Sequence, residues 1–213
     1  MILVDRPGAT QSHLSLALPG VPRLSKDYDA LLVLNTILGG QFSSRLNLNL
    51  REKHAYTYGV RSSFSFRHGP GPFSAGGAIV RESTGPAVQE ILSELQRIRT
   101  QSVSDEELDA AKSLLIRALP ARLESTDDIA DTLADISVYG LPLDEIATRP
   151  ARIQRVTRED VLHVAKAYLP SEGFRVIVVG DASVIKDQLA KVGLGDVTVK
   201  ELPKPQAAAP GKG

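Results

Sequence analysis

The order of hydrophobic periodicities along the chain is the feature that most restricts its fold. Three stretches before residue 80 have the pattern of strands, and between residues 86 and 168 apolar residues recur at helical spacing. A short β-branched run, FRVIVVG, then follows at 174–180. Strands followed by a block of helices are typical of α+β proteins. The sequence therefore predicts an α+β fold, with a largely antiparallel sheet and helices packed on one face.

Three strands are predicted in the first 80 residues. Residues 12–20 place three leucines on one face and end at a Pro-Gly pair, which indicates a half-buried strand. From Ala55 the period is again two, and this long strand would place Tyr58 and Val60 on its core face. The turn HGPGP joins it to residues 73–80, the expected antiparallel partner. The later run FRVIVVG is typical of a central strand.

Helices are predicted where a start signal precedes apolar residues at helical spacing. Residues 27–38 form a buried helix that stops at two glycines, and Ser43 or Ser44 caps a second helix that runs to about Lys53. The later start signals are Pro86, Ser104 with Glu107, Ser125 with Asp128, and Thr157 with Asp160. We expect the third of these later helices to bury Ile129, Leu133 and Ile136, and a short helix to close the fold at 182–193.

Length and composition bound the organisation and the partners. A chain of 213 residues can bury a full core, so we expect one domain over 1–202, followed by a disordered tail over 203–213. The balance of 25 basic and 25 acidic side chains predicts neither a nucleic-acid nor a membrane partner. Zero cysteines exclude disulfides and cysteine zinc sites and leave the compartment open. The first residues lack the pattern of a signal peptide.

Searches for catalytic motifs give negative results. The sequence contains neither H-E-x-x-H nor its inverse H-x-x-E-H, and it contains neither G-x-S-x-G nor a phosphate-binding G-x-x-x-x-G-K-[ST] loop. Carboxylates cluster at helix starts, where the helix dipole explains them. No metal ligand set is therefore predicted in this chain.

Several motifs in a fixed order nevertheless resemble one family. The run LGGQFSSRLNLNLREK, followed by YTYG, resembles the C-terminal, zinc-free half-domain of the pitrilysin/insulinase metallopeptidases, which include the mitochondrial processing peptidases and bacterial relatives. The segments VDRPGATQSHLSLALPGVPR, YDALLVLNTILGG, SDEELDAAKSLL and TREDVLHVAKAYL extend the resemblance over nearly the whole chain.

The resemblance implies a clamshell in which homologous half-domains close around a peptide. It implies zinc on an H-x-x-E-H helix of another half, and no cofactor in this chain. It also implies that Arg51 and Tyr58 are the pair that reaches the substrate near that metal. An arginine can donate a planar fork to peptide carbonyls, and a tyrosine hydroxyl can donate a hydrogen bond to a developing oxyanion.

The expected function is therefore that of the substrate-binding, non-catalytic half of a bacterial zinc metallopeptidase, inactive by itself. Its expected partners are a peptide and a zinc-bearing half-domain, in the same parent chain or in a partner subunit, and a dimer is compatible with the sequence. A fragment of a longer protease is favoured, because family subunits usually contain two half-domains. The sequence is compatible with either the bacterial cytoplasm or the periplasm. The alternative is a non-enzymatic structural or assembly domain of the same fold.

The same residues also allow a purely structural interpretation. Alternation places Tyr58 in the core, and Arg51 would then pair with a nearby carboxylate or cap helix carbonyls. His54 and Tyr56 flank the pair, but the resemblance implies no role for either of them. We expect His54 to lie at the surface and Tyr56 to lie in the core. Arg45 is expected to hold its own loop by hydrogen bonds.

Overall fold

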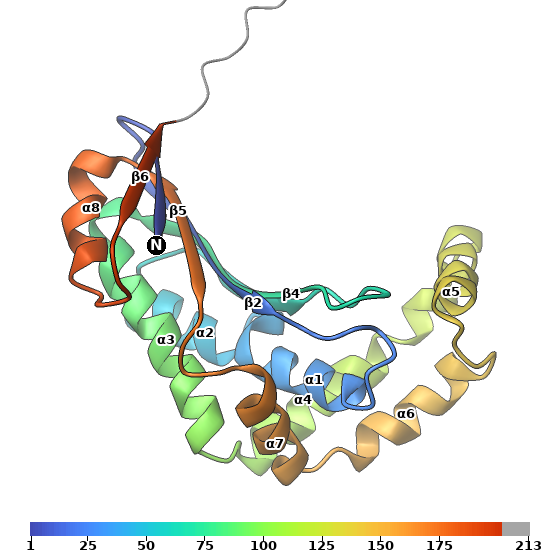
Figure 1. Cartoon of the computed structure of the whole chain (residues 1–213). Helices are drawn as coiled ribbons and strands as arrows, with labels where there is room; N and C mark the ends of the chain where they lie inside the picture. The colour runs from blue at the N-terminus through green and yellow to red at the C-terminus, as the bar shows by residue number, and fades with distance from the viewer. Residues whose placement is uncertain (202–213) are drawn as a thin grey trace, which may run out of the picture.

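A six-stranded sheet forms the centre of the fold. The structure is a computed structural model that describes residues 1–201, so the predicted tail at 203–213 lies outside the described residues (Figure 1). The strand order is β3-β4-β2-β5-β1-β6. The strands are β1 (Ile2–Asp5), β2 (Gln11–Pro19), β3 (Val60–Phe64), β4 (Pro72–Val80), β5 (Arg175–Gly180) and β6 (Thr198–Glu201).

The sheet is mixed, and most of its strand pairs are antiparallel. Strands β3 and β4, β4 and β2, and β2 and β5 pair in antiparallel fashion, whereas β1 pairs in parallel with β5 and β6. This confirms the α+β prediction. It also confirms the central position of the β-branched run, because β5 lies between β2 and β1.

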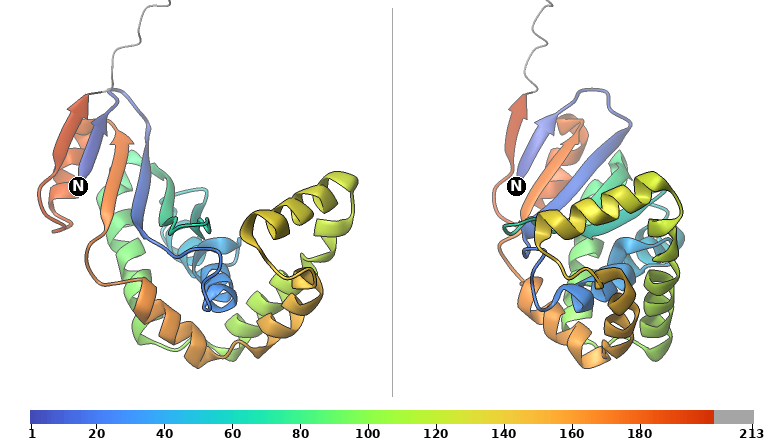
Figure 2. Two further views of the ribbon diagram at one scale, coloured as in Figure 1. Left: turned by 45° about the vertical axis from the view of Figure 1, so that its right-hand side comes forward. Right: turned by 90° about the vertical axis from the view of Figure 1, so that its right-hand side faces the viewer.

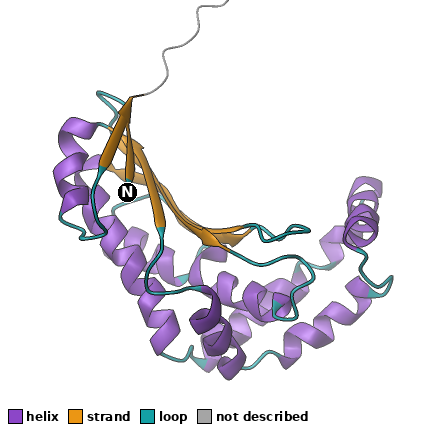
Figure 3. Cartoon of the chain, in the orientation of Figure 1, coloured by secondary structure: helices purple, strands orange, loops and turns teal. Residues whose placement is uncertain are grey.

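Most of the helices gather on one face of the sheet, as expected (Figures 1 and 3). The α-helices are α1 (Tyr28–Asn35), α2 (Arg45–Asn47), α3 (Thr84–Thr100), α4 (Asp105–Arg117), α5 (Thr126–Tyr139), α6 (Glu145–Arg155), α7 (Arg158–Tyr168) and α8 (Ala182–Ala190). Two π-helical segments, η1 (Thr36–Gly40) and η2 (Leu48–Lys53), extend α1 and α2, and η3 (Arg81–Ser83) and η4 (Pro120–Leu123) are short 3₁₀ turns. Among residues 1–201, no helix is both long and apolar enough to cross a membrane.

The alternation predicted for β2 is confirmed and supplies part of the core. Leu14, Leu16 and Leu18 are buried against the helices, while His13 on the opposite face is exposed. Burying a leucine side chain stabilises a fold by about 1.5 to 3 kcal/mol. The leucine row therefore fixes which face of the sheet the helices cover.

Helix starts follow the predicted capping signals. Ser104 and Glu107 form a capping box at α4, Thr157 and Asp160 form one at α7, and Ser125 accepts a hydrogen bond at the start of α5. The other two start signals differ in detail. Ser44 lies at the N-cap position of α2, but its side chain forms no capping hydrogen bond. Helix α3 begins at Thr84, two residues before Pro86.

The start of one strand and the burial of one helix differ from the sequence predictions. The strand expected from Ala55 begins only at Val60. In α5, Ile136 is buried, but Ile129 and Leu133 are 40% and 55% exposed. The reason is that α5 stands apart from the sheet and its helical layer (Figure 2), so only one end of its apolar stripe meets other side chains.

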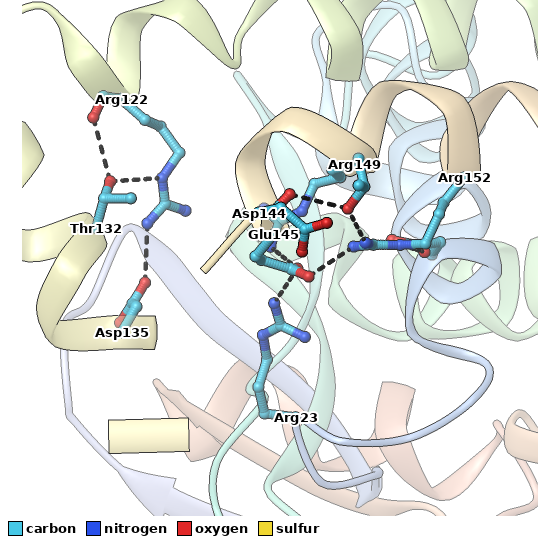
Figure 4. Close-up of polar contacts among 10 residues, drawn as sticks. Arg23, Arg122, Thr132, Asp135, Asp144, Glu145, Arg149 and Arg152 are labelled. Atoms are coloured by element: carbon cyan, nitrogen blue, oxygen red, sulfur yellow. Dashed lines mark hydrogen bonds and ion pairs between the residues drawn. The ribbon is translucent and has the colours of Figure 1, made fainter. Parts of the chain in front are cut away.

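Helix α6 was not predicted, since Pro150 interrupts its pattern and much of its sequence is charged. A buried carboxylate anchors it instead. Glu145 accepts hydrogen bonds from Arg23 at 2.8 Å and from Arg149 at 2.6 Å, and Arg152 lies 2.9 Å from its second oxygen (Figure 4). Burial alone would raise the pKa of Glu145, but the hydrogen bonds from Arg149 and Arg23 outweigh it and hold this pKa below its usual value.

Candidate functional site

Arg51 and Tyr58 lie on either side of a tight reversal between η2 and β3. Arg51 is in the last turn of η2, and the reversal passes through Ala55, whose φ of 54° is left-handed. The amides of Ala55 and Tyr56 donate to the carbonyls of Arg51 and Leu50 at 3.1 and 2.9 Å. These bonds satisfy the end of the helix and place both residues of the pair at one edge of the fold.

The alternation slips by one residue immediately before β3. The hydroxyl of Thr57 donates to the carbonyl of Ala78 at 2.6 Å and accepts from the amide of Gly59 at 3.0 Å, so Thr57 faces inward. Tyr58 and Gly59 then both face solvent, and Val60 is buried again. Tyr58 is 88% exposed, so the structural interpretation, in which alternation places its ring in the core, is wrong.

The side chain of Arg51 lies on an aromatic ring. Its guanidinium carbon is 4.1 Å from the centre of the Phe42 ring, and its Nε is 3.6 Å from the carboxylate of Glu52. Phe42 itself is 67% exposed. A ring over one face of a guanidinium leaves the in-plane N–H groups free to donate. Arg51 is therefore supported in position and keeps donors for a further acceptor.

A hollow of about 180 Å³ opens between the Phe42 loop and the Tyr58 segment. It is lined by Gly39, Gly40, Gln41, Phe42, Asn47, Tyr58, Gly59 and Arg61. Because Phe42 both lines the hollow and contacts Arg51, it connects the two residues of the pair. One exposed surface thus carries the guanidinium of Arg51, the ring of Phe42 and the phenol of Tyr58.

Asn47 holds the two sides of the hollow together. Its Oδ1 accepts from the amide of Val60 at 2.9 Å, and its Nδ2 donates to the carbonyl of Gln41 at 3.0 Å and to Ser44 Oγ at 3.3 Å. The sequence interpretation missed this residue. The available sequence signal was an asparagine between two leucines, inside a predicted helix and with no cap to form.

Gly39 fixes the back of the hollow. A Cβ atom there would lie 2.5 Å from the backbone nitrogen of Ser62, so η1 and β3 approach too closely for any side chain. We expect Gly39→Ala to destabilise the chain by about 1 to 3 kcal/mol, as overpacking does. Gly69→Ala is the matched control, because a Cβ at Gly69 meets no atom within 4 Å. Urea unfolding of both variants measures the difference, and equal midpoints would contradict the close approach.

Beneath η2 lies a layer of buried polar groups. Asn49 donates to Glu90 at 2.9 Å and to the buried Glu94 at 2.7 Å. His54 stacks on Tyr56 with 4.9 Å between ring centres, and its Nε2 is 3.8 Å from a Glu90 oxygen. These contacts fasten η2 to α3 and hold the helix turn that carries Arg51.

Arg45 has a different role from the one expected. Its Nε and Nη2 donate to the two carboxylate oxygens of Glu107 at 2.6 and 2.7 Å, so it joins α2 to α4 instead of holding its own loop. The hydrogen bond from Arg45 is the main reason that the pKa of Glu107 is lowered. The same carboxylate closes the capping box of α4 through the amide of Ser104.

The pair and the His residues do not form a metal centre. Among residues 1–201, no group of three His, Asp or Glu side chains is close enough to bind a metal ion. Zinc requires three or four such ligands. The described residues therefore do not fit a resident zinc, and the chemistry they offer is hydrogen-bond donation.

Comparisons with known proteins point to one family. Residues 1–115 match the family model described as the peptidase M16 inactive domain. An uncharacterized zinc protease of Streptomyces coelicolor is 29% identical over 159 residues, which cover 75% of this chain and 35% of the relative. A protein of Helicobacter pylori described as a non-peptidase homolog is 28% identical over 149 residues, which cover 68% of this chain and 34% of that protein.

A solved structure agrees with the sequence matches. The crystal structure of a peptidase M16 inactive domain from Pseudomonas fluorescens superposes with a TM-score of 0.77 at 28% identity. The match covers 84% of this chain and 43% of that one. The chain therefore spans less than half of the length of each of these relatives.

Proposed function

The chain belongs to the peptidase M16 inactive-domain family, and from this premise we propose that it is the substrate-binding, zinc-free half of a bacterial zinc metallopeptidase. The membership confirms the expected resemblance to the zinc-free half of the pitrilysin/insulinase enzymes. The observation that carries the proposal is the exposure of Tyr58, which is 88% exposed and lines the same hollow as Phe42, the residue whose ring lies against Arg51.

Each residue of the pair has a role that its chemistry supports. Arg51 donates in-plane N–H groups to carbonyl oxygens of a bound peptide, while Phe42 covers one face of its guanidinium. Tyr58 donates its hydroxyl proton in a hydrogen bond to the oxyanion that develops on the scissile carbonyl. Zinc belongs to the homologous half, in the same parent chain or in a partner subunit. These roles are tested by measuring the turnover of the assembled peptidase with wild-type chain, Arg51→Ala and Tyr58→Phe.

The second candidate function is that of a non-enzymatic structural or assembly domain. The description of the Helicobacter pylori relative as a non-peptidase homolog favours it. The neighbouring coding sequence distinguishes the two candidates. An upstream H-x-x-E-H motif supports the peptidase, and its absence from every homologous half encoded in the genome supports the assembly domain.

The isolated chain is expected to hold no stoichiometric zinc and to hydrolyse no peptide. The physical reason is its ligand set, since no three His, Asp or Glu side chains of residues 1–201 converge. Metal analysis after dialysis, together with cleavage assays on a peptide library, measures both properties. One tightly held zinc per chain with chelator-sensitive cleavage would refute this prediction.

A further inference from the structure

An apolar row lies uncovered on the part of the chain that stands furthest from the sheet. We call η4 and α5, residues 120–139, the arm; Figures 1 and 2 show it set apart from the layer of helices under the sheet. Ile129 and Leu133 lie one helical turn apart on α5, and they continue the stripe that ends in the buried Ile136. They are 40% and 55% exposed, and Leu123 of η4 is 49% exposed.

The arm is held in place by its own contacts. The side chain of Ser125 caps α5, and Arg122 donates to Thr132 at 3.4 Å and to Asp135 at 2.8 Å (Figure 4). At the other end of α5, the hydroxyl of Tyr139 donates to the carbonyl of Phe66 at 3.4 Å. These contacts fix the internal shape of the arm and tie one end of α5 to the segment at Phe66, which lowers the entropic cost of covering the apolar row.

The charge of the arm restricts what can cover it. Helix α5 carries four aspartates and no basic residue, and three of them, Asp127, Asp128 and Asp131, are exposed and form no ion pair within residues 1–201. The single arginine of the arm, Arg122, pairs with the fourth, Asp135. The helix dipole already favours Asp127 and Asp128 in the first turn of α5, but all three carboxylates add negative charge beside the apolar row, so a surface that combines apolar side chains with lysines or arginines complements this arm.

The relatives indicate where such a surface comes from. The chain covers 35% of the Streptomyces coelicolor relative and 43% of the Pseudomonas fluorescens chain, so each has more polypeptide outside the match than within it. Apolar side chains that lie uncovered next to one another are a feature of interaction surfaces. We propose that the arm docks the zinc-bearing half-domain, through Ile129 and Leu133 against apolar side chains and through the aspartates against basic ones. This inference rests on the proposed function.

The test is the affinity between this chain and the H-x-x-E-H half-domain encoded in the same genome, measured by calorimetry. The variant replaces Ile129 and Leu133 by Asp. Because Ile129 and Leu133 are already 40% and 55% exposed in the free chain, the variant should stay folded, and a melting curve of each chain checks this. We expect the dissociation constant to rise about 30-fold or more, the effect of removing central apolar contacts.

Val199→Asp is the matched control, because Val199 is also 40% exposed but lies on β6, at the opposite end of the molecule (Figure 1). It should leave the dissociation constant unchanged. Replacing Asp127 and Asp131 by Asn should weaken binding and flatten its dependence on salt.

The outcomes separate this inference from the proposed function. Unchanged affinity of the arm variant overturns the inference, even if Tyr58→Phe lowers turnover as proposed. A wild-type dimer in sedimentation that the arm variant abolishes also overturns it, because a second copy is then the occupant. If no zinc-bearing half binds the wild-type chain, both the inference and the proposed function fail.

Discussion

We expect Tyr58→Phe to lower kcat/KM of the assembled peptidase by about 10²-fold or more, with no change in the melting temperature of the chain. Loss of one transition-state hydrogen-bond donor costs roughly 2.7 to 4 kcal/mol of barrier. The phenol is 88% exposed, so its removal takes no packing from the core. The measurement is steady-state kinetics of the zinc-bearing half reconstituted with wild-type or variant chain, with a melting curve of each chain.

Tyr56→Phe is the matched control for that experiment. Tyr56 lies two residues away and is partly buried, with its ring stacked on His54. Loss of its hydroxyl should leave kcat/KM unchanged. Equal kinetics for wild type and a well-folded Tyr58→Phe chain would remove Tyr58 from the proposed site. Arg51→Ala should lower turnover as well. Arg51→Lys keeps the charge but loses the planar fork, so it should also lower turnover if the fork binds the peptide carbonyls.

Sequence patterns predicted the elements in which local signals and packing agree. Strand β2 has its leucines on one face because the same alternation that predicts a strand also builds the core. The capping boxes at Ser104 and Thr157 mark helix starts because they satisfy amides that have no partner within the helix. Such features require only neighbouring residues, so one sequence suffices to find them.

The wrong predictions come from contacts that are distant in sequence. Alternation alone could not show that the hydroxyl of Thr57 reaches the carbonyl of Ala78, which turns Tyr58 outward. Periodicity predicted burial for Ile129 and Leu133, but it cannot tell whether a covering surface belongs to the same chain. Helix α6 was missed because a buried ion network stabilises it, in which Arg23, far away in the sequence, donates to Glu145 at the start of the helix.

In the candidate site, too, the sequence located the residues but not the contacts that surround them. Motif order located Arg51 and Tyr58, and the structure places them on either side of one reversal. Their environment depends on residues that no spacing rule connects to them. Phe42 supports the guanidinium, and Asn47 joins both sides of the hollow. The roles of the pair still depend on the kinetic test, whereas its exposed geometry follows from the fold.

The largest effect on stability is expected from Glu145→Ala. Three guanidinium groups surround this carboxylate, and its side chain is only 5% exposed. Removal of one member of a buried ion network leaves the others uncompensated, at a cost of about 3 to 5 kcal/mol. For a domain of this length each kcal/mol lowers the melting temperature by about 2 to 4 °C. Calorimetry and urea unfolding should both report the loss.

Asp135→Asn is the matched control for Glu145→Ala. Asp135 also forms an ion pair with an arginine, but its side chain is 53% exposed, and such surface pairs contribute about 0 to 1 kcal/mol (Figure 4). Similar losses in the two variants would show that the Glu145 network contributes no more than a surface pair.

Acid titration tests the same carboxylate in the unmodified chain. Because the folded state lowers the pKa of Glu145, its contribution to stability is fully present above the unfolded value of about 4.3 and is lost as the pH falls through the folded value. Glu145→Gln has no proton to bind at this position, so its unfolding free energy should fall less steeply below about pH 4. Parallel acid profiles for wild type and variant would mean that the arginines do not stabilise the charged form of Glu145. In that case its contribution to anchoring α6 would come from packing alone.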